Sequence, residues 1–115
     1  HISNITVADK TDNYWMIIEF EIIEHDEFLG YQPDTYFILL GSRVEGKKRE
    51  VKKGKLRYIQ LGSSVNVNLK KRSAKDAVKD LLHCKCTIKL GQTGTGINSK
   101  NPIYGVFPYE GDGNV

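Results

Sequence analysis

The 115-residue chain has only two cysteines, three prolines and one tryptophan, and it has no long apolar run. A helix that crosses a bilayer needs about 20 predominantly apolar residues, whereas the apolar stretch 17–23 is interrupted by Glu19 and Glu21. No basic segment followed by an apolar stretch marks a signal peptide. Cys84 and Cys86 share one side of an extended segment, which is poor geometry for a disulfide. These absences predict a cytoplasmic protein with no membrane segment.

Motifs for metal binding and catalysis are equally scarce. The segment 83–86 (HCKC) has one residue between its cysteines, whereas structural zinc sites usually have about two to four and need a second pair of ligands. The glycine-rich segment 91–96 lacks the Gly-Lys-Ser/Thr ending and the following helix of a phosphate-binding loop. No serine lies in a nucleophile elbow. We therefore expect no enzymatic activity, no metal site and no cofactor.

Charge, in contrast, is abundant and is divided along the chain. Residues 1–42 contain one lysine and eight acids, a net charge of −7. Residues 43–89 contain fifteen Lys or Arg and four acids, a net charge of +11; residues 90–115 have a net charge of −1, which brings the total to +3. A strongly basic segment is typical of proteins that bind nucleic acid, because neutralising phosphates releases counterions. A solvated basic face that maintains solubility is the alternative.

Alternating apolar and polar residues predict a mainly β domain. In the segment 14–24, every second residue from Tyr14 to Ile22 is apolar, so this side of the strand is expected to face the core. The basic segment 43–57 (RVEGKKREVKKGKLR) has little to bury, and Gly46 or Gly54 offers a bend, so we expect a β-hairpin or loop there. Strands are expected at residues 4–8, 14–24, 36–40, 55–61, 65–69, 84–90 and 103–107.

A single helix is expected at about residues 74–82. Ser73 is a good N-cap, and Asp76 completes an approximate capping box. The apolar residues that follow have helical spacing: Ala74, Ala77, Val78, Leu81 and Leu82. The expected order is therefore several strands, one helix and then two more strands. A small five-stranded antiparallel OB-type barrel has this order. We expect one such domain at residues 1–109 and a short flexible acidic tail at residues 110–115.

The basic residues and their aromatic neighbours are candidate nucleic-acid contacts. Lys and Arg can follow a phosphate backbone while aromatic rings stack on bases. The predicted phosphate contacts of the basic segment are Arg43, Lys47, Lys48, Arg49, Lys52, Lys53, Lys55 and Arg57. The predicted stacking residues are Tyr58, Trp15 and Tyr36.

A second basic run, Lys70-Lys71-Arg72, directly precedes the expected helix. Cations are unfavourable beside a helix N-terminus. Phosphate binding at that N-terminus would explain their presence, and a solvated run is the alternative.

These features together resemble the OB-fold single-stranded DNA-binding proteins of phages, in particular those of lactococcal phages. The resemblance is carried by the chain's size and strand order, the helix Ser73–Leu82, the basic segment Arg43–Arg57 and the closing segment Asn101–Tyr109. It implies a homo-oligomer that coats single-stranded DNA without sequence preference in phage DNA replication and recombination, in the host cytoplasm. It also implies a recombinase or single-strand-annealing protein as a partner. The ending Asn114-Val115 lacks the hydrophobic tip through which bacterial relatives dock partners.

Two other readings remain open. The acidic residues between Glu19 and Asp34 and the basic block could pair between subunits, which would make the chain a protein-interaction module. The same barrel could also bind RNA, because nothing in the sequence identifies a contact to a 2′-hydroxyl group.

Overall fold

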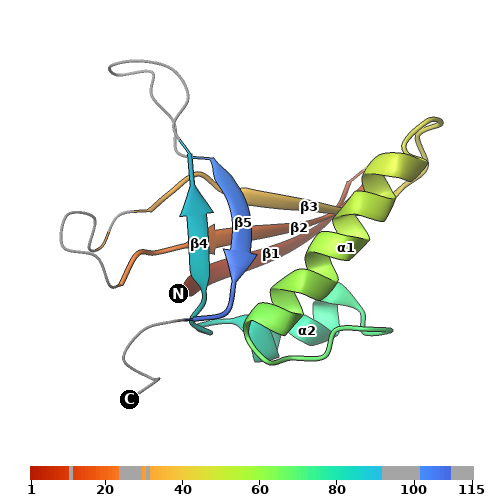
Figure 1. Ribbon diagram of the computed structural model, residues 1–115. Coiled ribbons are helices and arrows are strands. Elements are labelled where there is room, and N and C mark those ends of the chain that lie inside the picture. The colour runs from red at the N-terminus through yellow and green to blue at the C-terminus, as the bar shows by residue number, and fades with distance from the viewer. Residues whose placement is uncertain (11, 24–29, 31, 92–101, 110–115) are drawn as a thin grey trace.

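Three strands pair side by side to form the larger of two sheets. Strands β1 (Ile2–Lys10), β2 (Asn13–Phe20) and β3 (Tyr36–Ser42) are antiparallel, in the order β1-β2-β3 (Figure 1). The structure, a computed structural model, describes residues 1–10, 12–23, 30, 32–91 and 102–109. Aromatic and β-branched residues dominate the three strands, as is typical of side chains that pack on a pleated sheet. The first three expected strands are confirmed.

One face of this sheet forms much of the core. Met16, Ile18 and Phe20 on β2 are at most 1% exposed, and they share one side of the strand because side chains alternate between the two faces. The pairs Met16↔Ile38 and Phe20↔Ile2 extend the buried layer onto β3 and β1. Burying an apolar side chain of this size contributes about 1.5–3 kcal/mol. The alternation in the sequence therefore identified the correct core face.

Residues Lys48–Ser64 form a long helix, α1, that packs along β3. The expected basic hairpin or loop at 43–57 and the expected strand at 55–61 are therefore wrong, and the chain has two helices rather than one. Lys, Arg, Glu and Leu all favour helices. Gly54, Tyr58 and Leu61 recur at helical spacing and are buried, so the segment has a packed face as well as charged ones.

Gly54 is a packing residue rather than a bend. A Cβ at this position would collide with the backbone carbonyl of Leu39 on β3. Glycine thus allows α1 to approach the sheet closely in mid-helix, although it is less favourable than alanine there.

The segment after α1 is irregular, so the strand expected at 65–69 is also wrong. Asn66 has a φ of 62°, in the left-handed region that an extended strand does not contain. Val65, Val67 and Leu69 nevertheless pack against the core, as their alternation predicts.

Helix α2 (Ala74–Leu81) confirms the helix expected at 74–82. The hydroxyl of Ser73 accepts a hydrogen bond from the amide of Asp76 at 3.3 Å, as an N-cap should. Ala74, Ala77 and Leu81 form its buried stripe.

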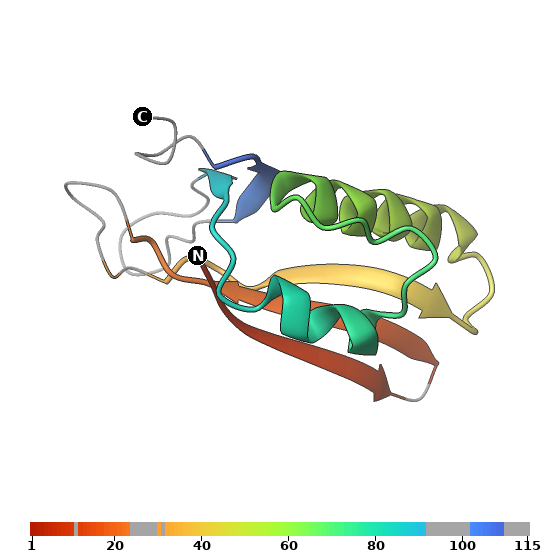
Figure 2. The same cartoon turned by 90° about the horizontal axis from the view of Figure 1, so that it is seen from below.

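Strands β4 (Thr87–Leu90) and β5 (Ile103–Phe107) form a second, two-stranded antiparallel sheet. Figure 2 shows this hairpin and α1 on the same side of the larger sheet, and the buried Val106 joins β5 to the common core. The described residues thus form a mainly β fold of two antiparallel sheets and two helices. Their strand pairing does not close a barrel. Two backbone hydrogen bonds, from Ile2 to Cys84 (3.0 Å) and from His83 to Ile2 (2.8 Å), do bring β1 next to the segment before β4.

Several predictions concern residues outside the described ranges. These include part of the acidic stretch between Glu19 and Asp34, most of the glycine-rich segment 91–96, and the tail 110–115. Within the described ranges, no helix combines the length and the apolar character that crossing a membrane requires.

Candidate nucleic-acid interface

The outer face of the larger sheet carries an aromatic pair. Trp15 on β2 and Phe37 on β3 alternate with the buried residues and so point away from the core. Their ring centroids are 6.0 Å apart and the ring planes meet at 83°, an edge-to-face contact. Phe37 is 51% exposed although it is a large apolar residue. Except at the β3 edge, where Leu39 is buried beside α1, none of the described helices or strands covers this face (Figure 2).

Helix α1 forms a wall beside this pair. Lys47, at the N-cap of the helix, and Lys53 and Arg57 within it line a cavity of about 300 Å³ together with Trp15 and Phe37. Gly54 and Leu39 also line it, at the point where the helix approaches the backbone of β3 closely. We call this cavity the aromatic–basic cleft. It brings together one flank of the basic segment and the exposed rings of the sheet.

The cleft is cationic. Among the described residues that line it, Glu50 is the one acid, against Lys47, Lys53 and Arg57, so these side chains carry a net charge of +2 (three minus one). Glu50 lies in the first turn of α1, where a carboxylate is favourable to the helix dipole. Phe37, which the sequence reading had not selected, is the exposed ring of the cleft. The sequence could have indicated this exposure, because Phe37 directly precedes the buried Ile38 and neighbouring residues of a strand point to opposite faces.

Two of the three predicted stacking residues point into the protein instead. Tyr58 is only 5% exposed, and its hydroxyl donates to the carbonyl of Arg72 at 3.1 Å. Burial raises the pKa of its phenol, an effect that the charge of Arg72 partly opposes. Tyr58 is thus a core residue and a base cannot stack on it. Its assignment as a stacking residue is wrong, because a helix rather than a hairpin carries it.

Tyr36 is half-buried and packs against the core side of β3. Its ring lies 6.4 Å from that of Phe20, and the guanidinium of Arg57 lies 5.9 Å from its centroid. Burial raises its pKa, and Arg57 partly offsets this. Arg57 therefore bridges Tyr36 and the cleft, and the Tyr36 ring supports Arg57 rather than the outer face.

The other predicted cations of the basic segment are exposed but point in several directions. Successive residues of a helix are about 100° apart around its axis, so the charges of α1 do not form a single row. Lys55 lines a second cavity, of about 380 Å³, with Lys71 and Arg72. The remaining exposed cations are Arg43, in the turn before α1, and Lys48, Arg49 and Lys52, on α1 away from the cleft lining.

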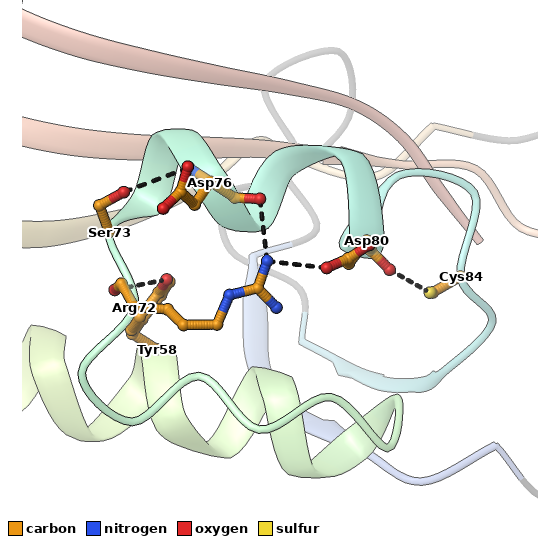
Figure 3. Close-up of polar contacts among 6 residues, drawn as sticks. All are labelled: Tyr58, Arg72, Ser73, Asp76, Asp80 and Cys84. Atoms are coloured by element: carbon orange, nitrogen blue, oxygen red, sulfur yellow. Dashed lines mark hydrogen bonds and ion pairs between the residues drawn. The ribbon is translucent and has the colours of Figure 1, made fainter.

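The basic run before α2 has a structural role in part. The guanidinium of Arg72 donates to the carbonyl of Asp76 at 3.0 Å and pairs with the carboxylate of Asp80 at 2.7 Å (Figure 3). This cation therefore lies along α2 and is matched by Asp80, an acid about two turns after the N-cap. Lys70 and Lys71 stay exposed, and Lys71 has a φ of 61°.

The two cysteines are free thiols. Burial, with a smaller contribution from Cys84, raises the pKa of Cys86 to about 11, while the N-terminal ammonium opposes this. Burial and the nearby Asp80 also raise the pKa of Cys84, whose thiol donates to the Asp80 carbonyl at 3.1 Å (Figure 3). Thiols that hold their protons are weak nucleophiles. Among the described residues, no group of three or more His, Cys, Asp or Glu side chains could hold a metal ion.

The chain matches no protein-family model, and comparison with curated proteins and with solved structures gives no match. The function proposed below therefore depends on the residues and their geometry.

Proposed function

We propose that the chain is a single-stranded DNA-binding protein whose primary contact surface is the aromatic–basic cleft. The observation that carries the proposal is the half-exposed ring of Phe37 beside Trp15, facing the cations of α1. Aromatic rings stack on unpaired bases, and lysine and arginine neutralise the adjacent phosphates. The cleft has both groups within one cavity, as non-specific recognition of a single strand requires.

The chemistry of the cleft favours single strands over duplex. In a duplex the base faces are covered by neighbouring bases, so Phe37 and Trp15 could reach them only by unstacking. In a single strand these faces are accessible, and each base stacked on an aromatic side chain contributes about 1–3 kcal/mol.

The two sides of the outer face differ in charge. Glu19 is exposed on the same side of β2 as Trp15, and its carboxylate accepts from the side-chain amide of Asn4 on β1 at 3.1 Å. A carboxylate repels phosphate, so the β1 side of the sheet is unfavourable for the phosphate backbone of bound DNA. We infer that the single-stranded DNA runs beside α1 rather than across the whole sheet.

We retain the OB-type barrel as part of this proposal. Three antiparallel strands are followed by helical structure and then by a two-stranded hairpin, the general order of an OB-type domain. The hydrogen bonds between Ile2 and residues 83 and 84 support it, because they join the beginning of β1 to the segment that enters β4.

The direct test is a titration of the protein with oligo-dT, followed by the fluorescence of Trp15, the only tryptophan. Because Trp15 lines the cleft, a stacked base should quench it. Duplex of the same length should bind more weakly, and an oligo-U titration reports on RNA. Replacing Phe37 by alanine should weaken binding to oligo-dT by about 5- to 100-fold, the equivalent of one stacked base.

Leu56→Ala is the matched control. Leu56 is 65% exposed on α1 and does not line the cleft, so this variant removes exposed apolar surface from elsewhere. It should bind as the unmodified chain does. If oligo-dT neither quenches Trp15 nor shifts the protein in a gel at low salt, the proposal is wrong. Salt-sensitive self-association without nucleic-acid binding would then favour a protein-interaction module.

A further inference from the structure

A second set of exposed aromatic rings lies on the β4–β5 hairpin. Tyr104 is 63% exposed and Phe107 is 42% exposed, the former being among the most exposed large apolar side chains of the described residues. Ile88 and Val106 occupy the inner side of the same hairpin and pack on the core. Exposure of two rings on so short a hairpin is not needed to form that core.

Both rings lie over glycines. The Tyr104 ring occupies the space that a Cβ of Gly91 would take, and the Phe107 ring lies 2.9 Å from the corresponding position at Gly105. A glycine has no side chain to hold a ring away from the backbone, so each ring rests on the backbone with its other side exposed. The register of the hairpin shifts at Tyr104, which has no cross-strand partner between the pairs Lys89↔Gly105 and Leu90↔Ile103. This irregularity interrupts the alternation of side chains, so Tyr104 is exposed like Phe107 although Val106 between them is buried. This arrangement covers strand glycines, and it also provides two supported aromatic surfaces.

The charge around these rings is positive. The hairpin segments 84–91 and 102–109 contain two lysines and no acid. Lys89 is exposed and pairs across the sheet with Gly105, so it shares the outward face with Phe107. The ammonium of Lys85, also exposed, lies 5.4 Å from the ring centroid of Tyr109.

The hairpin face and the aromatic–basic cleft point in opposite directions. The hairpin packs its inner side on α1 and the common core, on the side of the larger sheet that α1 occupies (Figure 2). Trp15 and Phe37 alternate with the buried residues of β2 and β3 and so lie on the outer face of that sheet. A short oligonucleotide bound in the cleft therefore cannot contact Tyr104 or Phe107. A longer one can reach them by passing around the molecule.

We propose that the outward face of the β4–β5 hairpin, formed by Tyr104, Phe107 and Lys89, is a second contact surface for the same single strand. Bases stack on the two rings, and Lys89 neutralises a neighbouring phosphate. The inference rests on the proposed function, since its ligand is the strand held in the cleft. Charge complementarity selects this ligand: two lysines without an acid, beside supported rings, fit a polyanion with exposed base faces.

The test compares oligo-dT of about 5 and about 20 nucleotides. One OB-type domain occupies roughly 4–16 nucleotides, so the first length is near the lower end of this range and the second exceeds its upper end. Both are labelled and followed by fluorescence anisotropy at low salt. The double variant Tyr104→Ala, Phe107→Ala should bind the long strand at least about fivefold more weakly, which is the lower value for one stacked base. It should bind the short strand as the unmodified chain does.

Lys89→Gln tests the same surface with both rings in place. It should lower the salt dependence of binding to the long strand only, by about 0.7 in the slope of log K against log salt. Lys79→Gln, an exposed lysine on α2, is the matched control and should leave the slope of both strands unchanged. Photocrosslinking of the unmodified chain to a long strand containing 5-bromodeoxyuridine should label the peptide that includes Tyr104 or Phe107.

The outcomes separate the two proposals. If the unmodified chain binds neither strand, the proposed function is wrong and the inference with it. If it binds both strands but the double variant and Lys89→Gln leave long-strand binding unchanged, only the inference is overturned. If the double variant instead converts a dimer to a monomer with unaltered affinity per chain, the face binds a second copy, which also overturns the inference.

Discussion

At the scale of single residues, the burial of Cys86 determines its chemistry. Burial raises the pKa of its thiol from 9.0 to about 11. Near pH 9 the folded protein should therefore hold about 1% of this thiol as thiolate, against about half in the unfolded chain. We predict that iodoacetamide modifies Cys86 about 50-fold more slowly at this pH in the folded protein, because the thiolate is the nucleophile.

The measurement is the alkylation rate between pH 7 and 12 in a Cys84→Ser variant, which leaves Cys86 as the single thiol. The urea-unfolded chain gives the ordinary titration. The neutral thiol also contributes to stability: this contribution is complete below about pH 9 and declines as the pH rises toward 11, because the unfolded chain releases the proton first. A half-maximal rate near pH 9 in the folded protein would contradict the assigned burial.

Single aromatic residues also show what the sequence could and could not predict. Trp15 was identified as a candidate contact from the sequence, and the structure places it in the cleft. Tyr58, which was selected for the charges beside it in the sequence, is buried, whereas Phe37, which the sequence analysis does not single out, is exposed. Proximity to lysines in the sequence does not determine whether a side chain points to solvent or to the core. That depends on which side of its helix or strand the residue occupies, and therefore on whether the segment is a helix or a strand.

At the scale of secondary-structure elements, the contact between α1 and β3 depends on Gly54. A methyl group there would collide with the backbone of Leu39, which cannot move as a flexible side chain can. We predict that Gly54→Ala destabilises the protein by about 1–3 kcal/mol, the usual range for overpacking. This effect should exceed the gain of about 0.5–1 kcal/mol from a better helix former. The variant should also weaken oligo-dT binding, because Gly54 lines the cleft.

Urea unfolding followed by circular dichroism gives the free energy of unfolding. Gln60→Ala, at an exposed position of the same helix, is the matched control and should change that free energy little. A Gly54→Ala variant that is as stable as the unmodified chain would show that α1 can move away from β3.

The same helix explains why the sequence predicted some elements and missed another. β2 and α2 each have a clear period of apolar residues, β1, β3 and β5 are short segments rich in β-branched, aromatic or other apolar residues, and all of them were predicted. In α1 the buried side consists of two glycines, a tyrosine, a leucine and a serine, so an apolar stripe is barely visible in the sequence. Glycine in a charged segment is typical of a turn, whereas here it fits a helix against a strand. Only the partner strand reveals that role.

At the scale of the whole molecule, the charge segregated along the sequence becomes charge distributed around a helix. The sequence predicts a β-hairpin or loop at residues 43–57, all of whose cations contact the phosphates of one nucleic-acid strand. Because α1 presents them on different sides, only Lys47, Lys53 and Arg57 line the cleft. The net charge of the segment is therefore a poor measure of the number of phosphates that it contacts.

This leads to a comparison between two neighbouring lysines. Lys53 lines the cleft, and Lys52, about 100° away around the helix axis, does not. Lys52→Ala and Lys53→Ala remove the same charge, so the general electrostatic attraction of the protein for DNA falls equally in both. We predict that Lys53→Ala alone reduces the salt slope for a short oligo-dT by about 0.7, the value for one phosphate contact on a single strand.

The slope is measured by fluorescence anisotropy at four or more salt concentrations, with an oligonucleotide short enough to occupy the cleft alone. A reduction in Lys53→Ala with little change in Lys52→Ala would assign the phosphate path to the cleft side of α1. Equal slopes in the two variants would mean that the strand responds to the overall charge of the helix. The path beside Phe37 would then be wrong, even if the protein binds single-stranded DNA.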